Sequence, residues 1–255
     1  SLDGLIPELG IRESLEANSD ISRILQESET QVVINLLPSG SNLATEFYAN
    51  QALMANCHFV NAIPTPLATL NQWKKRFRAK NLVLLGDDIK SQFGATMLNR
   101  LIIQALKQRG IIVHHSHQHN RGGNMDHLNL VHRQKEKEHS KKKTIEQFLS
   151  ADDGEVSVSF EYTGKPSSHK QVEITIEASI FGQTPLIIHA NIEDEISLNG
   201  AGIAVDALRV AKLIADQQNF SSINLVGAYL FKNPAKHLSD DKAYQAFERF
   251  LRQNV

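Results

Sequence analysis

Apolar runs that alternate with helical patterns constrain the fold of the first half of the chain most strongly. Three runs resemble buried strands, and each is followed by a helical stretch: QVVINLLP, HFVNAI and NLVLLG. A long helical pattern then ends near Gly110, a residue type common after helix C-termini, and leads into the run IIVHH. Because such alternation is typical of right-handed βαβ units, we predict a parallel α/β sheet over residues 30–117.

The pattern changes near residue 150. Three later segments alternate polar with apolar residues: EVSVSFEYTG, QVEITIEASIF and PLIIHANIE. This period of two is typical of antiparallel strands with one buried face, so we predict an antiparallel, β-rich section over about residues 155–192. Helical patterns that can cover this section follow over GAGIAVDALRVAKLIADQ and DDKAYQAFERFLRQ.

The composition is that of a globular protein, because 41% of the 255 residues are hydrophobic and 22% are charged. The formal net charge of −1 argues against a general attraction to nucleic acid or to an anionic membrane. No apolar run approaches the roughly 20 residues of a membrane span. Cys57 is the only cysteine and no hydrophobic signal segment follows Ser1, so we expect a cytoplasmic protein without an intramolecular disulfide.

The stretch GDDIKS places charged residues at the end of a buried strand. Asp87, Asp88, Lys90 and Ser91 follow an apolar run and a glycine, where open α/β sheets bind their ligands. The N-terminus of the next helix would also favour an anion. Alternatively, one aspartate caps the helix and the other groups are solvated. Position alone does not separate these two interpretations.

The segment NRGGNMDHLN, residues 120–129, is a second candidate. Its paired glycines allow a close approach of the backbone to a ligand, although an ordinary turn explains them equally well. A turn does not explain the clustered side chains of Asn120, Asn124, Asp126 and Asn129.

Two further segments are rich in titratable side chains. On a strand, His115, His117 and His119 would share one face, as a metal site requires, but no second ligand cluster accompanies them and we predict no metal. The segment RQKEKEHSKKKTIEQ is either a solvated helix face or a bank of ammonium groups near phosphate or an oxyanion. No nucleophile elbow, P-loop, HExxH or GxGxxG motif is present.

Seven segments together resemble the inositol-3-phosphate synthase (myo-inositol-1-phosphate synthase) family, especially its shorter archaeal and bacterial branch. They occur in the order of the family and cover most of the chain: NLLPSGSNLATEFYANQAL, FVNAIPT, GDDIKSQFGAT, GGNMDHLN, SKKKT, HANIEDEISLNGAGIAVDALRVAKL and AYLFKNP. The most specific are GDDIKSQFGAT and GGNMDHLN.

The resemblance implies a cytoplasmic, NAD-dependent isomerase of inositol and phospholipid biosynthesis. Such enzymes convert D-glucose 6-phosphate to 1D-myo-inositol 3-phosphate by oxidation, enolisation, intramolecular aldol cyclisation and reduction. Each step creates or moves an alkoxide or enolate, so the site needs fixed cations and proton carriers.

The resemblance also implies roles for individual residues. The cationic group, which would contact phosphate or stabilise oxyanions, comprises Lys90, Lys143, Lys170 and Lys232. Asp126 and Asp194 match acids that position those lysines or relay protons through them. The expected cofactor-binding residues are Gly40, Ser41, Asp87, Asp88 and Ser91.

The implied organisation has three parts. Residues 1–130 would form a partial Rossmann-like NAD-binding portion, residues 131–220 a catalytic and oligomerisation portion of α+β type, and residues 221–255 a segment returning to the first part. The implied substrate is glucose 6-phosphate, and a homo-oligomer, dimer or tetramer, is expected.

Two departures from the family pattern keep an alternative open. Family members begin with a Gly-rich βαβ unit that holds the NAD pyrophosphate, whereas SLDGL resembles a point after that unit. We therefore expect this chain alone to bind NAD weakly or not at all. His139 also stands where the family has the first lysine of its SK..SK element, with Lys143 at the second. The alternative is a non-catalytic relative that binds sugar phosphate or protein partners without NAD.

Overall fold

The chain forms two compact units. The computed structural model describes residues 19–124, 127–128, 131, 145–146, 149–150 and 152–254. The first unit comprises Ser1–Lys90 and Gly200–Val255, and the second comprises Ser91–Asn199. A functional division at residues 130 and 220 stays a prediction.

The first unit contains the predicted parallel sheet. Its strands are β1 (Val32–Asn35), β2 (His58–Asn61) and β3 (Leu84–Leu85), hydrogen-bonded in parallel in the order β1-β2-β3. The helices between and before them are α1 (Ile21–Glu27), α2 (Asn42–Met54) and α3 (Asn71–Ala79). The strand–helix alternation predicted for this part of the chain is therefore confirmed.

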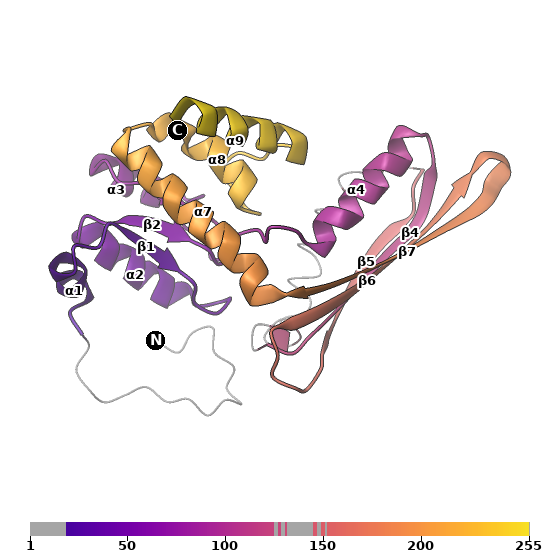
Figure 1. Ribbon diagram of the computed structural model, residues 1–255, viewed down its shortest axis with the longest axis horizontal. Helices are drawn as coiled ribbons and strands as arrows, with labels where there is room; N and C mark the ends of the chain where they lie inside the picture. The colour runs from indigo at the N-terminus through magenta and orange to yellow at the C-terminus, as the bar shows by residue number, and fades with distance from the viewer. Residues whose placement is uncertain are drawn as a thin grey trace. The chain divides into compact units, whose positions relative to one another are not determined.

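Helices cover both faces of this sheet (Figure 1). On one face, α2 and α3 pack through Ala49, Ala52, Trp73 and Phe77 against Phe59. The other face is covered by the C-terminal helices, which are α7 (Ile196–Asp216), α8 (Ile223–Leu230) and α9 (Asp240–Asn254). This burial on both faces explains why the strands are continuous apolar runs.

The second unit is a four-stranded sheet with the order β5-β4-β6-β7. Its elements are α4 (Ala95–Gln108), β4 (Ile112–Gly122), β5 (Glu155–Tyr162), β6 (His169–Ile180) and β7 (Thr184–Glu195). The long hairpin of β6 and β7 is antiparallel, as is the pairing of β4 with β6, whereas β4 and β5 run parallel. The predicted β-rich section is confirmed, but it is a mixed sheet.

The placement of the run IIVHH in the parallel sheet was wrong. This run is the start of β4, which continues to Gly122 and belongs to the second sheet. The sequence pattern ends at His115 because the later inward side chains are polar. Ser116, Gln118 and Asn120 are fully buried. Hydrogen bonds within the unit, such as Ser116 Oγ to Asn99 Oδ1 at 3.0 Å, compensate part of this burial, while Oε1 of Gln118 has no partner among the described residues.

One face of the second sheet forms a core with α4. Val172, Ile174 and Ile176 of β6 are nearly inaccessible and pack with Ile103 and Leu106 of α4. Burying each such side chain contributes about 1.5–3 kcal/mol relative to exposure. We call this the inner face. The helix ends as predicted at Gly110, whose φ of 69° and N–H bond to the carbonyl of Lys107 close the last turn.

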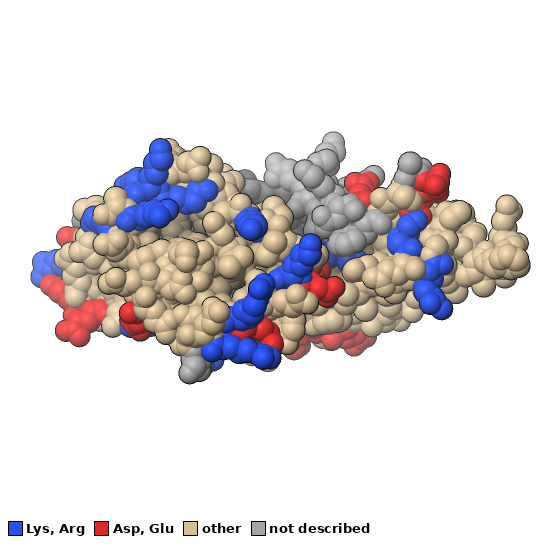
Figure 2. Space-filling model, turned by 90° about the horizontal axis from the view of Figure 1, so that it is seen from above, with Lys and Arg blue, Asp and Glu red and all other residues tan. Residues whose placement is uncertain are grey.

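The surface charge is mixed, as the composition indicates. On the face drawn in Figure 2, Lys and Arg side chains and Asp and Glu side chains both appear among larger uncharged areas. Within the described part of the chain, no helix combines the length and apolar character that crossing a membrane requires.

Candidate active site

A row of buried polar side chains marks the carboxyl edge of the parallel sheet. Asn35 ends β1, Asn61 ends β2, and Asp87 follows β3. The Nδ2 atom of Asn35 donates to Oδ1 of Asn61 at 2.8 Å, and Nδ2 of Asn61 donates to Oδ1 of Asp87 at 2.8 Å. Ligands of open α/β sheets bind at this edge. The hydrogen-bonded row therefore fixes the strand ends on which the candidate site is built.

The carboxylate of Asp87 accepts five hydrogen bonds and is fully buried. The backbone N–H groups of Leu67, Ala68 and Thr69 donate at 3.0, 2.9 and 3.2 Å. The hydroxyl of Thr69 donates at 3.0 Å, in addition to the Asn61 amide. Asp87 therefore anchors the loop after β2, and any contribution to cofactor binding would act through that loop.

The GDDIK and FKNP motifs lie side by side within the first unit. Asp87 and Asn233 exchange backbone hydrogen bonds of 3.0 Å in both directions, and Lys232 donates its N–H to the carbonyl of Asp88 at 2.7 Å. The Nζ atom of Lys232 also pairs with Oδ1 of Asp88 at 2.9 Å. The lysine side chain is 55% exposed, so its ammonium group is accessible to a ligand while one carboxylate fixes its position.

Lys90 lies on the same segment but contacts helix ends. Its Nζ donates to the carbonyl of Ala228 near the C-terminus of α8 at 2.9 Å and lies 3.8 Å from the carboxylate of Asp240 at the start of α9. A cation near a helix C-terminus and an acid near an N-terminus are both favourable arrangements. These contacts give Lys90 a structural role beside any catalytic one.

In the second unit, the register of the sheet brings three predicted motifs together. Gly122 of β4 lies opposite Lys170 of β6, and Lys170 lies opposite Asp194 of β7. By the period of two along each strand, Lys170 and Asp194 belong to the inner face, at the end of its apolar rows. We call the turn at Gly122 and Gly123 the glycine loop. The register therefore makes this loop, Lys170 and Asp194 neighbours at one end of the sheet.

The paired glycines serve close packing, because neither has a positive φ. A Cβ atom on Gly122 would lie 2.7 Å from Nδ1 of His127, and a Cβ atom on Gly123 would lie 2.1 Å from the carbonyl oxygen of Lys165. Backbone bonds from Thr163 and Ser167 to the two glycine carbonyls hold the same turn. That turn leads directly into β6, so the glycines fix the approach of the strand that carries Lys170.

We expect Gly123→Ala to destabilise the second unit. The new methyl group would overlap a backbone carbonyl, which is unable to move without its turn, and overpacking of this kind costs about 1–3 kcal/mol or more. Urea unfolding and hydrogen exchange at the Ser167 amide would measure the loss. Gly200→Ala is the matched control, because nothing lies within 4 Å of a Cβ atom there. Equal stability of the two variants would contradict the packing role of Gly123.

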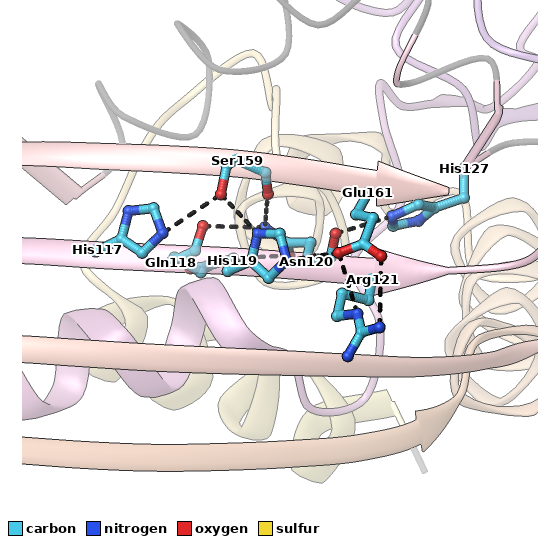
Figure 3. A network of polar contacts seen from close by, with 8 residues as sticks. All are labelled: His117, Gln118, His119, Asn120, Arg121, His127, Ser159 and Glu161. Atoms are coloured by element: carbon cyan, nitrogen blue, oxygen red, sulfur yellow. Dashed lines mark hydrogen bonds and ion pairs between the residues drawn. The ribbon is translucent and has the colours of Figure 1, made fainter. Parts of the chain in front are cut away.

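A polar network supports the glycine loop from the inner face (Figure 3). The Nε2 atom of His127 lies 3.2 Å from the carbonyl oxygen of Asn120, and the His127 N–H donates to Asn124 Oδ1 at 2.7 Å. Gln118 Nε2 donates to Asn120 Oδ1 at 3.0 Å. His127 is only 2% exposed and its ring packs against Phe160, so this side chain is part of the loop's support.

The opposite, outer face of β4 carries the three predicted histidines in a continuous chain with serines of β5. Ser157 Oγ lies 3.0 Å from His115 Nε2 and 2.8 Å from His117 Nδ1. Ser159 Oγ lies 3.4 Å from His117 Nε2 and 2.7 Å from His119 Nδ1. The histidines share one face, as expected. Among the described residues, no group of three or more His, Cys, Asp or Glu side chains is arranged to hold a metal ion.

The carboxylate of Glu161 lies at one end of this chain of hydrogen bonds. Glu161 Oε2 lies 3.1 Å from Nε2 of His119 and 3.2 Å from Nε of Arg121 (Figure 3). The hydrogen bond from His119, followed by the charge of Arg121, lowers the pKa of the Glu161 carboxyl. Because an ionised carboxylate only accepts hydrogen bonds, Nε2 of His119 is the donor in its contact with Glu161.

We expect the chain to lose stability below neutral pH through His117. Burial, and then the neighbouring His115 and His119, lower the pKa of His117. Below the unfolded value of about 6.5, the unfolded state therefore binds a proton that the folded state does not, so the free energy of unfolding falls as pH drops toward the folded pKa. Urea unfolding at several pH values should show a smaller fall for His117→Gln than for the wild type.

The control for this pH effect is His237→Gln, which alters an exposed histidine of the first unit. It should retain the wild-type dependence on pH. An identical dependence in the His117→Gln variant would exclude His117 as its source.

The other predicted site residues are distributed between the two units. Gly40, with a φ of 96°, and the buried Ser41 precede α2 at the carboxyl edge of β1. Ser91 begins the second unit. Asp126 and Lys143 lie outside the described residues. Lys232 belongs to the first unit and Lys170 to the second, and their action in one site stays a prediction.

The sequence interpretation missed three supporting residues. Asn35 and Asn61 were signalled by the matching strand ends VVIN and HFVN, since a polar residue closing an apolar strand points to the ligand-binding edge. Nothing in the sequence indicated His127. Its ring is buried in space that is free because Gly122 has no Cβ atom.

Comparisons with known proteins show which proteins the chain resembles in sequence. The family model described as myo-inositol-1-phosphate synthase matches residues 94–195. The chain is 37% identical over 242 residues to the inositol-3-phosphate synthase of Mycolicibacterium smegmatis, covering 91% of this chain and 66% of that protein. It is 35% identical over 252 residues to the inositol-3-phosphate synthase of Corynebacterium glutamicum, covering 94% of this chain and 69% of that protein. The chain thus spans about two thirds of the length of these curated relatives.

Solved structures share the fold of this chain. A protein named Ari2 superposes with a TM-score of 0.78 at 27% identity, over 92% of this chain and 66% of that one. A myo-inositol-1-phosphate synthase-related protein from Thermotoga maritima superposes with a TM-score of 0.72 at 25% identity, over 90% of this chain and 68% of that one.

Proposed function

Because the chain belongs to the inositol-3-phosphate synthase family, we propose that it takes part in the conversion of D-glucose 6-phosphate to 1D-myo-inositol 3-phosphate. The observation that carries the proposal is the register of the second sheet, in which Lys170 lies between the glycine loop and Asp194. A lysine that lies opposite an aspartate in the sheet register suits a reaction that passes through alkoxide and enolate anions.

In this proposal, lysines contact the anionic groups of the substrate, and carboxylates orient the lysines. Lys170 and Lys232 stabilise oxyanions or bind the phosphate, and the ion pair with Asp88 fixes the position of Lys232. Asp88 pairs with Lys232 at 2.9 Å, and Asp194 lies opposite Lys170 in the sheet. Asp126 and Lys143 are assigned to the same reaction by family resemblance, and Lys90 supports the segment that carries Asp88.

NAD is the proposed cofactor. The carboxyl edge of β1, β2 and β3 fits one end of a dinucleotide, because a glycine with a positive φ and a buried serine precede α2 there. Gly40, Ser41, Asp88 and Ser91 would hold the cofactor, while Asp87 would hold the loop beside it. When bound, NAD supplies a reversible hydride acceptor, and the chain's own residues orient the sugar and stabilise its anions.

The alternative of a non-catalytic relative is less well supported. Curated relatives that match more than 90% of this chain carry the name inositol-3-phosphate synthase. The acids and lysines expected from the family motifs are present in order, except that His139 replaces the first lysine of the SK..SK element. We also propose a homo-oligomer, with the outer face of the second sheet, where the described side chains of β7 are exposed, as the contact surface.

The direct test is conversion of glucose 6-phosphate by the protein purified from its complete reading frame. With NAD present, ³¹P and ¹H NMR should record the loss of glucose 6-phosphate and the appearance of inositol phosphate, without net consumption of NAD. Binding of glucose 6-phosphate without conversion under these conditions would favour the non-catalytic alternative.

A further inference from the structure

The side-chain amide of Asn199 connects three segments of the second unit. Its Nδ2 atom donates to Oδ2 of Asp194 at 2.6 Å and to the carbonyl of Phe93 at 2.7 Å. Its Oδ1 atom accepts the N–H of Phe93 at 3.2 Å, and its backbone carbonyl accepts the N–H of Gln92 at 3.2 Å. Asn199 therefore ties the start of α7 to the end of β7 and to the segment before α4.

These contacts leave the amide of Asn199 with one orientation. An asparagine side chain has two N–H donors and one carbonyl acceptor, and each takes part in a contact here. The two contacts with Phe93 fix the plane of the amide against a peptide group. The remaining N–H then points at Oδ2 of Asp194, which accepts it.

The two oxygens of the Asp194 carboxylate differ in their hydrogen bonding. Its Oδ1 atom is buried, and among the residues that the structure describes it accepts no hydrogen bond. Asp194 lies opposite Lys170, and both residues belong to the inner face at the end of the sheet. Asn199 thus occupies one oxygen of the carboxylate and leaves the other for a partner on this face.

We propose that Asn199 is a positioning residue for the reaction, which holds Asp194 so that its Oδ1 atom is presented to the ammonium group of Lys170. This inference rests on the proposed function, in which Lys170 and Asp194 act on the sugar. Asn199 itself contacts neither sugar nor cofactor in this proposal. Its effect passes through the orientation of the carboxylate and, from there, of the lysine.

Asn199→Asp tests the inference with almost no change of shape. The new carboxylate can still accept the Phe93 N–H, but it replaces a donor with a like charge beside Asp194. In the full protein with glucose 6-phosphate and NAD, kcat should fall about tenfold to a hundredfold while KM changes little, the scale of a misplaced catalytic group. The acidic limb of the kcat profile should move to higher pH, because adjacent carboxylates favour a protonated form.

Asn191→Asp is the matched control. It makes the same chemical change on the same strand, but at an exposed position of the outer face. This variant should keep the wild-type kcat and pH profile. A purely structural role for Asn199 would lower the yield of folded enzyme without moving the pH profile. A wild-type kcat and pH profile for Asn199→Asp would overturn the inference.

A second readout separates this inference from the proposed function. If the wild-type protein fails to convert glucose 6-phosphate, the proposed function fails, and ¹³C NMR titration of the Asp194 carboxyl carbon decides the inference alone. A midpoint that moves to higher pH in Asn199→Asp, but not in Asn191→Asp, supports control of this carboxylate by Asn199. An unchanged midpoint in Asn199→Asp overturns it.

Discussion

Replacing Lys232 by alanine is expected to lower the turnover of glucose 6-phosphate by about two to four orders of magnitude, the usual scale for loss of a general acid or an oxyanion contact. The ammonium group is held by Asp88 at 2.9 Å, yet the side chain is 55% exposed. It is therefore fixed in position and still able to reach a ligand. Lys170→Ala should have a similar effect, because Lys170 lies opposite Asp194 in the sheet register and is the other lysine proposed to contact an oxyanion or the phosphate.

Stability should change far less than turnover in Lys232→Ala. An ion pair with one exposed partner contributes about 0–1 kcal/mol, so thermal unfolding should separate catalytic loss from unfolding. Lys236→Ala is the matched control, since this exposed lysine lies in the same connection between α8 and α9. Turnover within threefold of the wild type in Lys232→Ala would remove Lys232 from the proposed reaction, where threefold is about 0.7 kcal/mol.

The elements with a strong hydrophobic period were predictable from the sequence. The strands of the first unit are continuous apolar runs because helices bury both of their faces. The hairpin of β6 and β7 was predictable because its residues alternate between the α4 core and solvent. In both cases the burial pattern is periodic and local, so it is visible without tertiary information.

β4 was assigned to the wrong sheet because its inner face departs from the rule that inward residues are apolar. Ser116, Gln118 and Asn120 are buried among polar partners contributed by α4, β5 and their own strand. These hydrogen bonds join segments distant in sequence, so the hydrophobic pattern of β4 alone does not reveal them. The buried polar residues of β4 precede Gly122 and Gly123, the loop that lies opposite Lys170.

The candidate site was partly predictable for a similar reason. The sequence indicated that Asp87 follows a strand at the ligand-binding edge, and the structure has it there. It could not indicate that five protein donors already occupy the carboxylate. Those donors lie 18 to 26 residues away in the chain, and their convergence is a product of the fold. Motif position and side-chain availability are therefore separate questions at this edge.

Asp87→Ala is expected to destabilise the first unit by about 3–6 kcal/mol. The substitution would leave the buried N–H groups of Leu67 and Ala68 and the partly buried N–H of Thr69 without their acceptor. Each unsatisfied buried group costs about 1–3 kcal/mol, so the two buried groups account for most of this loss and Thr69 adds a smaller part. The loss of the Asn61 contact would also open the polar row beneath the loop. A change of this size approaches the whole stability of a typical domain, about 5–15 kcal/mol. Urea unfolding followed by Trp73 fluorescence would measure it, because Trp73 lies in the core beside that loop.

Asp87→Asn refines the test, since it keeps the shape but turns one acceptor into a donor that faces backbone N–H groups. It should cost less than alanine because one oxygen remains, but it should still lower the urea midpoint clearly. Asp206→Asn is the control, as its partly exposed side chain on α7 pairs only weakly with Arg209 at 3.8 Å, and surface changes of this kind stay within about 0.5 kcal/mol. If Asp87→Asn and Asp206→Asn unfold at the same urea concentration, Asp87 is not the anchor of the loop, and its carboxylate is then available for the cofactor after all.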